Sequence, residues 1–350
     1  MNKKFLIVIL RFHGDVLLTK PMIDNIKLNL PDSEVDLLVY EGTGSILEND
    51  KKVSETIEIE SSSKKNIFTR IKDEINLWRK LSSKKYDYAF FLTTQWRVVP
   101  ISWALGKTKK AAVDDKKRRK NLWIKSFSTI FPEASGNHIV QRNLLALESL
   151  GLKIFNEDLT LDPSILEIEY KALEKDYPFL ANKSSYCVIH PTSRRETKLW
   201  SKDKFSSLVS LLHQKGLSVV ITSGPDKSET DYVDEILRKT GQSEGSTLNL
   251  SGKTSLLSLA ALIKGSNFFI GLDSVASHIA ASVDTESITL FGPSNPINWR
   301  PWSDKAKVIS RAGNEEFCEL HGCKEGKFKQ CLCYIEIEDV VSLVDQMSVK

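Results

Sequence analysis

Three stretches of this 350-residue sequence place polar and charged side chains directly after a run of apolar residues. The most informative runs from Gly271 to Ser282, where an apolar segment ends in Asp273 and Ser274 and small residues follow. Asp and Ser favour the first position of a helix, and a helix N-terminus offers unpaired N–H groups and a positive dipole to an anion. The pattern predicts a strand, a turn and a short helix with a phosphate-binding site at Ser274. Any β-α-β unit of a Rossmann-like domain has the same pattern.

Two further segments have the same form. Residues 4–10 are apolar and break into Arg11-Phe12-His13-Gly14-Asp15 before a helical pattern. Residues 186–189 form another apolar run, which opens into the polar stretch from His190 to Trp200. Because open α/β sheets bind ligands at the carboxyl ends of their strands, both segments are candidate sites.

With these three segments in this order, the sequence resembles the ADP-heptose:lipopolysaccharide heptosyltransferases, glycosyltransferase family 9. The similarity extends from Lys4 to about Val344, and the opening at Arg11–Asp15 is most similar to the heptosyltransferase III branch of inner-core enzymes. The resemblance implies an inverting transfer of heptose from ADP-L-glycero-D-manno-heptose to the inner core of lipopolysaccharide, with no metal and no cofactor. Three alternatives stay open: a family member that uses another nucleotide sugar, a nucleotide-sugar or glycan binding protein without catalysis, and an epimerase of the same fold.

Asp15 has two possible roles at the end of the first strand. As a structural residue it would cap the following helix, and as a functional residue it would accept the proton of an acceptor hydroxyl. The resemblance implies that the matching Asp is the general base, and we adopt that assignment. Arg11 and His13 beside it are assigned to a phosphate or a sugar of the acceptor.

Lys198 is the second predicted catalytic residue. The departing ADP gains negative charge in the transition state, which a fixed ammonium group would stabilise. Thr192 and Ser193 supply hydroxyl groups just after the strand and match the phosphate-contacting positions of the family. Glu229, which follows the turn at residues 223–225, is a candidate contact for the ribose or the adenine.

The stretch after residue 271 supplies the remaining donor-site candidates. Ser274 is the expected phosphate seat, whereas Asp273 is expected to hold the turn or to bind a sugar, because its charge would repel a diphosphate. His278 lies four residues after Ser274, on the same face of the expected helix, and matches the family pattern. Val275 departs from the family, which has Gly or Ala there, so the approach of the phosphate to the backbone stays open.

The net charge of +4 is modest but unevenly distributed. Between Lys107 and Lys125, nine basic residues stand against two acidic ones. The centre of this basic run consists of Lys116, Lys117, Arg118, Arg119 and Lys120. A solvated loop would have such a composition, but the run, followed by Trp123, Ile124 and Phe127, also suits an anionic membrane or a phosphorylated glycolipid. We assign it to the acceptor and the membrane surface rather than to nucleic acid, for which no motif is present.

Alternating strand and helix patterns predict two Rossmann-like domains with parallel sheets, a GT-B arrangement facing across a central cleft. We expect an acceptor-binding domain over residues 1–165 and a nucleotide-sugar domain over 166–335. The resemblance implies a last helix over 336–350 that crosses back to the first domain. Strands are expected at residues 4–10, 34–40, 56–60, 86–92, 186–189, 217–222, 247–250, 267–271 and 287–290. Helices are expected at residues 15–29, 66–81, 96–105, 138–150, 202–215, 229–240, 255–264 and 274–282.

Localisation follows from what the sequence lacks. No apolar stretch approaches the roughly 20 residues needed to span a bilayer, and the apolar run at residues 5–10 is too short for a signal peptide. These features predict a cytoplasmic protein, and the resemblance together with the basic run implies that it is peripheral to the cytoplasmic face of the inner membrane.

Two patterns resemble a zinc site and a nucleotide-binding loop, but neither has the required spacing. The cysteines near the C-terminus are spaced C-x4-C-x7-C-x-C, which lacks the C-x2-C pairs of common zinc modules. They are Cys318, Cys323, Cys331 and Cys333, with His321 among them. We predict reduced thiols, with bound zinc as the alternative. Residues 251–254 resemble the end of a Walker A motif, but Thr247 stands where its first glycine is required, so we predict no P-loop.

Overall fold

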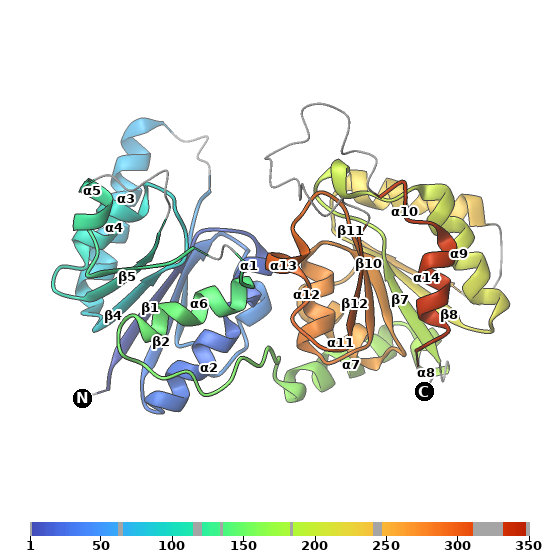
Figure 1. The fold of residues 1–350 in the computed structure, drawn as a ribbon, viewed down its shortest axis with the longest axis horizontal. Helices are drawn as coiled ribbons and strands as arrows, with labels where there is room; N and C mark the ends of the chain where they lie inside the picture. Colours follow the sequence, from blue (N-terminus) through green and yellow to red (C-terminus); the bar gives the residue numbers. More distant parts are fainter. Residues whose placement is uncertain are drawn as a thin grey trace. The chain divides into compact units, whose positions relative to one another are not determined.

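A computed structural model of the chain describes residues 2–61, 66–114, 121–133, 136–182, 185–240, 247–310 and 332–347. The chain divides into two compact units, Met1–Asp158 and Leu159–Lys350 (Figure 1). Each unit contains a parallel sheet with helices on both faces, as the alternating pattern predicts. No helix among these residues is both long and apolar enough to cross a bilayer.

The sheet of the first unit has the strand order β3-β2-β1-β4-β5-β6, and its pairs are all parallel. Its strands are β1 (Lys4–Ile9), β2 (Glu34–Tyr40), β3 (Glu55–Ile59), β4 (Tyr88–Phe91), β5 (Lys109–Val113) and β6 (Thr129–Phe131). The order reverses at β1, which pairs with β2 on one side and with β4 on the other. Ligands of open α/β sheets bind at such reversals, so the segment after β1 is at the expected place for a site.

The helices of this unit are α1 (His13–Leu17), α2 (Lys20–Asn29), η1 (Ser45–Leu47), α3 (Ile67–Lys84), α4 (Val98–Ala104), α5 (Asn121–Lys125) and α6 (Ile139–Glu148). Side chains of α3, α4 and α5 fill the core on one face of the sheet, and α2 packs on α6 on the other (Figure 1). The helix expected over 15–29 is two helices. It breaks before Pro21, which lacks the N–H of a helix interior and suits a first turn.

The second unit repeats this design with the strand order β12-β11-β10-β7-β8-β9. Its strands are β7 (Tyr186–His190), β8 (Ser218–Ser223), β9 (Thr247–Ser251), β10 (Phe269–Leu272), β11 (Ser287–Phe291) and β12 (Ala306–Ser310). Its helices are α7 (Pro163–Asp176), α8 (Pro178–Asn182), η2 (Glu196–Lys198), α9 (Lys202–Gln214), α10 (Lys227–Thr240), α11 (Leu256–Gly265), α12 (Val275–Ser282), α13 (Pro296–Trp299) and α14 (Ile337–Val344). The order reverses at β7, which pairs with β10 and β8.

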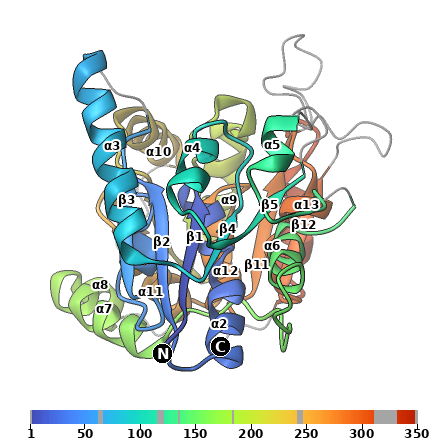
Figure 2. The same ribbon diagram turned by 90° about the vertical axis from the view of Figure 1, so that its left-hand side faces the viewer.

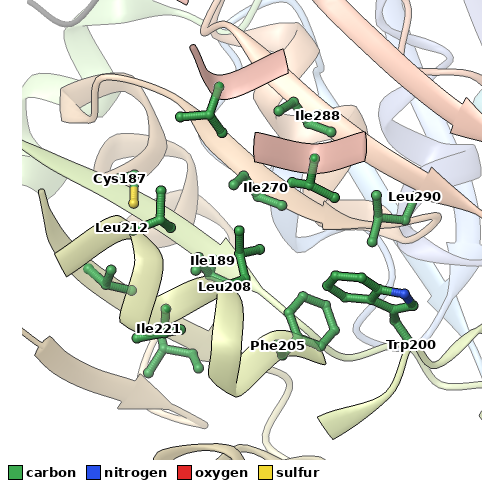
Figure 3. Packing of buried hydrophobic residues seen from close by; sticks show 14 of the residues in the cluster. Cys187, Ile189, Trp200, Phe205, Leu208, Leu212, Ile221, Ile270, Ile288 and Leu290 are labelled. Atoms are coloured by element: carbon green, nitrogen blue, oxygen red, sulfur yellow. The ribbon is translucent and has the colours of Figure 1, made fainter. Parts of the chain in front are cut away.

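Trp200 anchors the segment after β7 to the core of the second unit. Its side chain is 2% exposed and packs edge-on against Phe205 of α9, with ring centroids 4.9 Å apart (Figure 3). Its indole N–H donates to the carbonyl of Ile335 at 3.0 Å. Trp200 therefore lies under the polar segment, which fixes residues 191–199 over the carboxyl end of the sheet.

The boundaries of the units differ from the sequence expectation in two places. The division falls at Asp158 rather than at residue 165, because Leu161 already donates its N–H to the carbonyl of Ser282 in α12. The last helix, expected to return to the first domain, packs instead on α9 and β12, with Val340 and Val344 buried in the core of the second unit.

The residues after the basic run, which the sequence analysis assigned to a membrane surface, are mostly buried. Trp123 is 1% exposed and Phe127 is 8% exposed, and both belong to the core of the first unit, whereas Ile124 between them is 46% exposed. Their apolar rings therefore stabilise the packing of α5 on the sheet, and of the three residues after the basic run only Ile124 faces solvent.

Candidate active site

Polar side chains of the second unit gather at the carboxyl ends of three adjacent strands. β10, β7 and β8 are neighbours in the sheet, and they end at Leu272, His190 and Ser223. The segments that follow contain the predicted donor-site residues on η2, on α10 and at the start of α12. Because the strands are parallel, these segments meet at one edge of the sheet.

Lys198 and Asp273 form an ion pair at this edge. The Nζ of Lys198 lies 2.5 Å from Oδ2 of Asp273, and the two side chains are 17% and 8% exposed. Asp273 is also held by its backbone, whose N–H donates to the carbonyl of Leu290. The carboxylate thus fixes the ammonium group over the carboxyl end of β10, so a diphosphate that binds Lys198 must share the lysine with Asp273 or replace the carboxylate.

Thr192 and Glu229 are joined by a short hydrogen bond. The hydroxyl of the buried Thr192 donates to Oε2 of Glu229 at 2.5 Å, and the N–H of Gly224 donates to the same oxygen at 3.0 Å. A Cβ on Gly224 would lie 2.9 Å from the Glu229 carboxylate, so a larger residue there would displace that carboxylate. A hydroxyl has one proton to donate. Thr192 can therefore donate to a phosphate only when another donor takes its place on Glu229.

His190, at the end of β7, supports this network and was missed by the sequence reasoning as a functional residue. Its Nδ1 lies 2.9 Å from the hydroxyl of Thr222, and its Nε2 lies 3.4 Å from that of Thr192. Burial lowers the pKa of His190 to about 4, so the ring is neutral at pH 7. The only signal in the sequence was a polar side chain at the last position of an apolar strand.

Ser274, the predicted phosphate-binding residue, lies just before the first turn of α12. Ser274 precedes the helix in an extended conformation, and its N–H points to Oγ of Ser277 at 3.4 Å. The side chain of Ser274 faces the N–H of Ser277 in a capping box, and its hydroxyl donates to no group within the described ranges, which leaves the hydroxyl proton available to a bound anion. His278 is 6% exposed on the same helix, and Val275 at its first position is half-buried, as is Ser193 after β7.

In the first unit, Asp15 is the third residue of α1, so it is not the N-cap, which is Phe12. Its Oδ1 lies 2.6 Å from Nε of Arg11, and its Oδ2 accepts the N–H of Phe12 at 3.4 Å. The carboxylate is therefore held by Arg11 at the carboxyl end of β1, with the half-buried His13 at the start of the same helix.

Arg142 of α6 is a buried cation near this site that the sequence reasoning missed. It is 6% exposed and donates to Oδ1 of Asn143 at 2.9 Å, while its Nε–H has no hydrogen-bond partner in the part of the chain that the structure describes. Burial and the nearby charge of Arg11 lower the pKa of Arg142 to about 10, and Asp15 opposes this change, so Arg142 remains charged at pH 7. The sequence held one signal for this residue: an arginine occupies a position on the apolar face of the helix predicted over residues 138–150. Charged side chains are rarely buried without partners, so an arginine at such a position is a candidate functional residue.

The basic run does not form one surface in the described residues. Its centre, residues 116–120, lies outside them. Lys110 donates to the carbonyls of Ser102 and Gly106, and burial lowers its pKa. Lys107 and Lys109 line a hollow of about 420 Å³ at the amino end of β5, the edge opposite to the one that carries Asp15.

The cysteine cluster is described only in part. Cys318, Cys323, Cys331 and His321 lie outside the described residues, and Cys333 is exposed. Cys187 is buried in β7, as expected, and burial raises its pKa to about 12, so its thiol stays protonated at pH 7.

A family model described as glycosyltransferase family 9 (heptosyltransferase) matches residues 75–329, more than half of the chain. The chain belongs to glycosyltransferase family 9. It is 36% identical over 338 residues to lipopolysaccharide heptosyltransferase 3 of Escherichia coli K12, covering 97% of this chain and 96% of that protein. Membership makes the chain a glycosyltransferase and confirms the resemblance on which the site residues were assigned.

Solved structures of family 9 proteins share the fold. The glycosyl transferase family 9 structure from Veillonella parvula has a TM-score of 0.79 and 21% identity, and the alignment covers 98% of this chain and 96% of that one. E. coli heptosyltransferase WaaC with ADP has a TM-score of 0.75 and 20% identity, covering 98% and 99%. The two parallel six-stranded sheets are therefore those of a GT-B type family 9 enzyme.

Proposed function

We propose that this chain is an inverting heptosyltransferase that transfers heptose from ADP-L-glycero-D-manno-heptose to the inner core of lipopolysaccharide, in the manner of heptosyltransferase III. The observation that carries the proposal is the 36% identity to lipopolysaccharide heptosyltransferase 3, which extends over 97% of the chain. The polar side chains described above, which lie at the carboxyl ends of strands in both units, support it.

The donor binds the second unit in this proposal. Its diphosphate approaches Ser274 and the N-terminus of α12, where the hydroxyl proton of Ser274 and the helix dipole favour negative charge. Lys198 then stabilises the charge that collects on the β-phosphate as the glycosidic bond breaks. A ribose hydroxyl that donates to Glu229 would take the place of Thr192 and free the threonine proton for phosphate.

The acceptor binds the first unit. Its hydroxyl oxygen attacks the anomeric carbon from the face opposite to ADP, the bond to the β-phosphate oxygen breaks, and the hydroxyl proton passes to Asp15. Arg11 orients the Asp15 carboxylate, and Arg142 supplies a buried donor for an anionic group of the acceptor, with His13 at the same edge. The proposal includes no metal and no cofactor, because Lys198 and the dipole of α12 supply positive charge at the diphosphate.

We place the protein in the cytoplasm, at the cytoplasmic face of the inner membrane, because a lipid-anchored acceptor requires contact with a membrane. Lys116–Lys120 would contact the acceptor or anionic lipid, and screening by salt should weaken that contact. Neutralising these five residues should lower vesicle association and raise the acceptor KM. If neither changes, the run has no part in binding.

The decisive experiment uses the purified protein with core oligosaccharide from a strain that lacks it. ADP-heptose should support ADP release together with addition of one heptose, and the Asp15→Asn variant should not. Transfer from a different nucleotide sugar would favour another family 9 specificity. Donor binding without transfer would favour a binding protein, and donor turnover without acceptor would favour an epimerase.

A further inference from the structure

Exposed apolar side chains concentrate on one part of the first unit. The described residues contain thirteen exposed large hydrophobic side chains, and seven of them lie on α3, on α5, or on α4 and the turn before it. These seven are Ile67, Phe68, Ile71, Trp96, Trp103, Leu122 and Ile124. The other six are scattered over both units. Scattered exposed apolar side chains are normal, whereas a concentration of them marks an interaction surface.

The first half of α3 does not pack on the protein core. The buried residues of this helix, Leu77 and Leu81, both lie in its second half. Phe68 is 80% exposed, and Ile67 and Ile71 are 57% and 49% exposed. Figure 2 shows the amino-terminal turns of α3 extending past the strands. Asn66 caps these turns by accepting the N–H of Thr69 at 2.9 Å, so the helix begins as a defined element that presents its apolar residues to solvent.

Polar contacts join α3, α4 and α5 into one surface. Arg97, just before α4, pairs with Glu74 of α3 at 2.5 Å. Trp103 of α4 donates its indole N–H to Oγ of Ser126, just after α5, at 3.1 Å. Because this N–H is satisfied within the protein, the 55% exposed ring of Trp103 offers mainly apolar area, and tryptophan is enriched where proteins meet membranes.

Topology places this surface at the edge that carries Asp15. β3, β4 and β5 run parallel to β1, and α3, α4 and α5 each follow one of them. These helices therefore begin at the carboxyl end of the sheet, where Asp15 follows β1. Both views show α3, α4 and α5 side by side (Figures 1 and 2).

The charges around these apolar residues favour an anionic partner. Arg70 and Lys72 stand in the first half of α3, and Lys125 ends α5. The acidic residues of these two helices are Asp73 and Glu74, and Glu74 is paired with Arg97. Apolar residues flanked by basic ones on a surface helix are typical of segments that lie in the interface of an anionic membrane.

We infer that the first half of α3, together with Trp103 and α5, inserts into the interface of a bilayer that contains anionic phospholipids. This inference rests on the proposed function in one respect: a lipid-anchored acceptor gives the insertion its purpose. Insertion at this surface brings the edge of the sheet that holds Asp15 close to the membrane in which the acceptor is anchored.

Vesicle binding of the full chain tests the inference, with vesicles of phosphatidylcholine and phosphatidylglycerol that contain neither donor nor acceptor. The Phe68→Ser/Ile71→Ser variant should bind at least about tenfold more weakly, because it loses the burial of two large apolar side chains. The matched control is Phe155→Ser/Ile168→Ser, which removes side chains that are 57% and 70% exposed elsewhere, and it should bind like the wild type. Brominated acyl chains should quench tryptophan fluorescence less in Trp103→Phe than in the wild type.

Equal binding by the α3 variant and its control would overturn the inference. Binding that salt abolishes but the α3 variant leaves intact would also overturn it, in favour of the basic run alone or of a protein partner for this surface. Transfer to a lipid-free oligosaccharide should be unchanged in the α3 variant. If the wild type binds vesicles through α3 but transfers no heptose, the proposed function fails and the membrane surface stands.

Discussion

The Lys198→Ala substitution separates two roles of one ammonium group, its pairing with Asp273 and its proposed action on the ADP leaving group. Exposed ion pairs contribute about 0–1 kcal/mol to stability, whereas breaking a buried pair costs about 3–5 kcal/mol. With exposures of 17% and 8%, this pair lies between those limits. We therefore expect Lys198→Ala to lower the free energy of unfolding of the second unit by about 2 kcal/mol, roughly 4–8 °C in melting temperature.

The effect on transfer should be larger than the effect on stability. Loss of one fixed group that stabilises charge in the transition state typically lowers kcat about 10²–10³-fold, or about 2.7–4 kcal/mol. Both quantities can be measured on the same preparation, by thermal unfolding and by ADP release with saturating ADP-heptose and acceptor. Lys171→Ala is a matched control, because Lys171 pairs with Glu167 at 2.8 Å while both side chains are about 70% exposed. It should leave both stability and transfer unchanged, because solvent screens an exposed ion pair.

A double-mutant cycle with Asp273→Ala decides between the two roles of Lys198. Removing both partners leaves no buried charge without a counter-charge, so the double variant should regain most of the stability that Lys198→Ala loses. Transfer should stay low, because the leaving group still lacks its ammonium. If transfer returns together with stability, Lys198 serves only to neutralise Asp273, and the leaving-group assignment is refuted.

Three further substitutions test the remaining assignments. Asp15→Asn keeps an acceptor for the Phe12 N–H, so it should fold normally while transfer falls about 10²–10⁴-fold; near-normal transfer would move the role of base to His13. The pKa of His190 is about 4 in the folded protein and about 6.5 in the unfolded chain, so below about pH 6.5 the unfolded chain binds a proton that the folded protein does not. The free energy of unfolding should therefore fall by on the order of 3 kcal/mol between pH 7 and pH 4. His190→Asn should flatten this dependence in melting experiments, and an unaltered pH profile would contradict it. Arg142→Met removes the hydrogen bonds that the guanidinium donates to Asn143 and to the carbonyl of Leu92, so stability should fall by about 1–3 kcal/mol. The acceptor KM should rise about 10–100-fold if the unpaired Nε–H of Arg142 binds an anionic group, and an unchanged KM would exclude that role.

The sheets were largely predictable because their central strands are continuous apolar runs. The expectation for residues 34–40 coincides with β2, and the other eight predicted strands are present with ends shifted by at most two residues. The sequence analysis missed β5, β6 and β12. β5 begins with two lysines that belong to the basic run, β6 has three residues, and β12 is only half-buried. β6 and β12 are edge strands, which are commonly short and less apolar, so their sequences carry little periodic signal.

Single residues of the site could be predicted, but their partners could not. Polar side chains after a buried strand marked Asp15, Lys198 and Asp273 as candidates, because such positions face the ligand-binding edge of a parallel sheet. The pairing of Lys198 with Asp273 depends on β7 lying beside β10, although 75 residues separate the two side chains. Strand order is a property of the whole sheet, and no local pattern in the sequence encodes it.

These partners change what ligand binding must accomplish. Lys198 is held by Asp273, Asp15 by Arg11, and the hydroxyl of Thr192 by Glu229. A ligand that engages one of these groups exchanges an internal contact for its own, so it gains only the difference between the two interactions. The internal contacts keep the side chains in place before the substrate arrives, which lowers the conformational entropy lost on binding. On this reasoning, the apparent ligand affinity of each group depends as much on its internal partner as on its own charge.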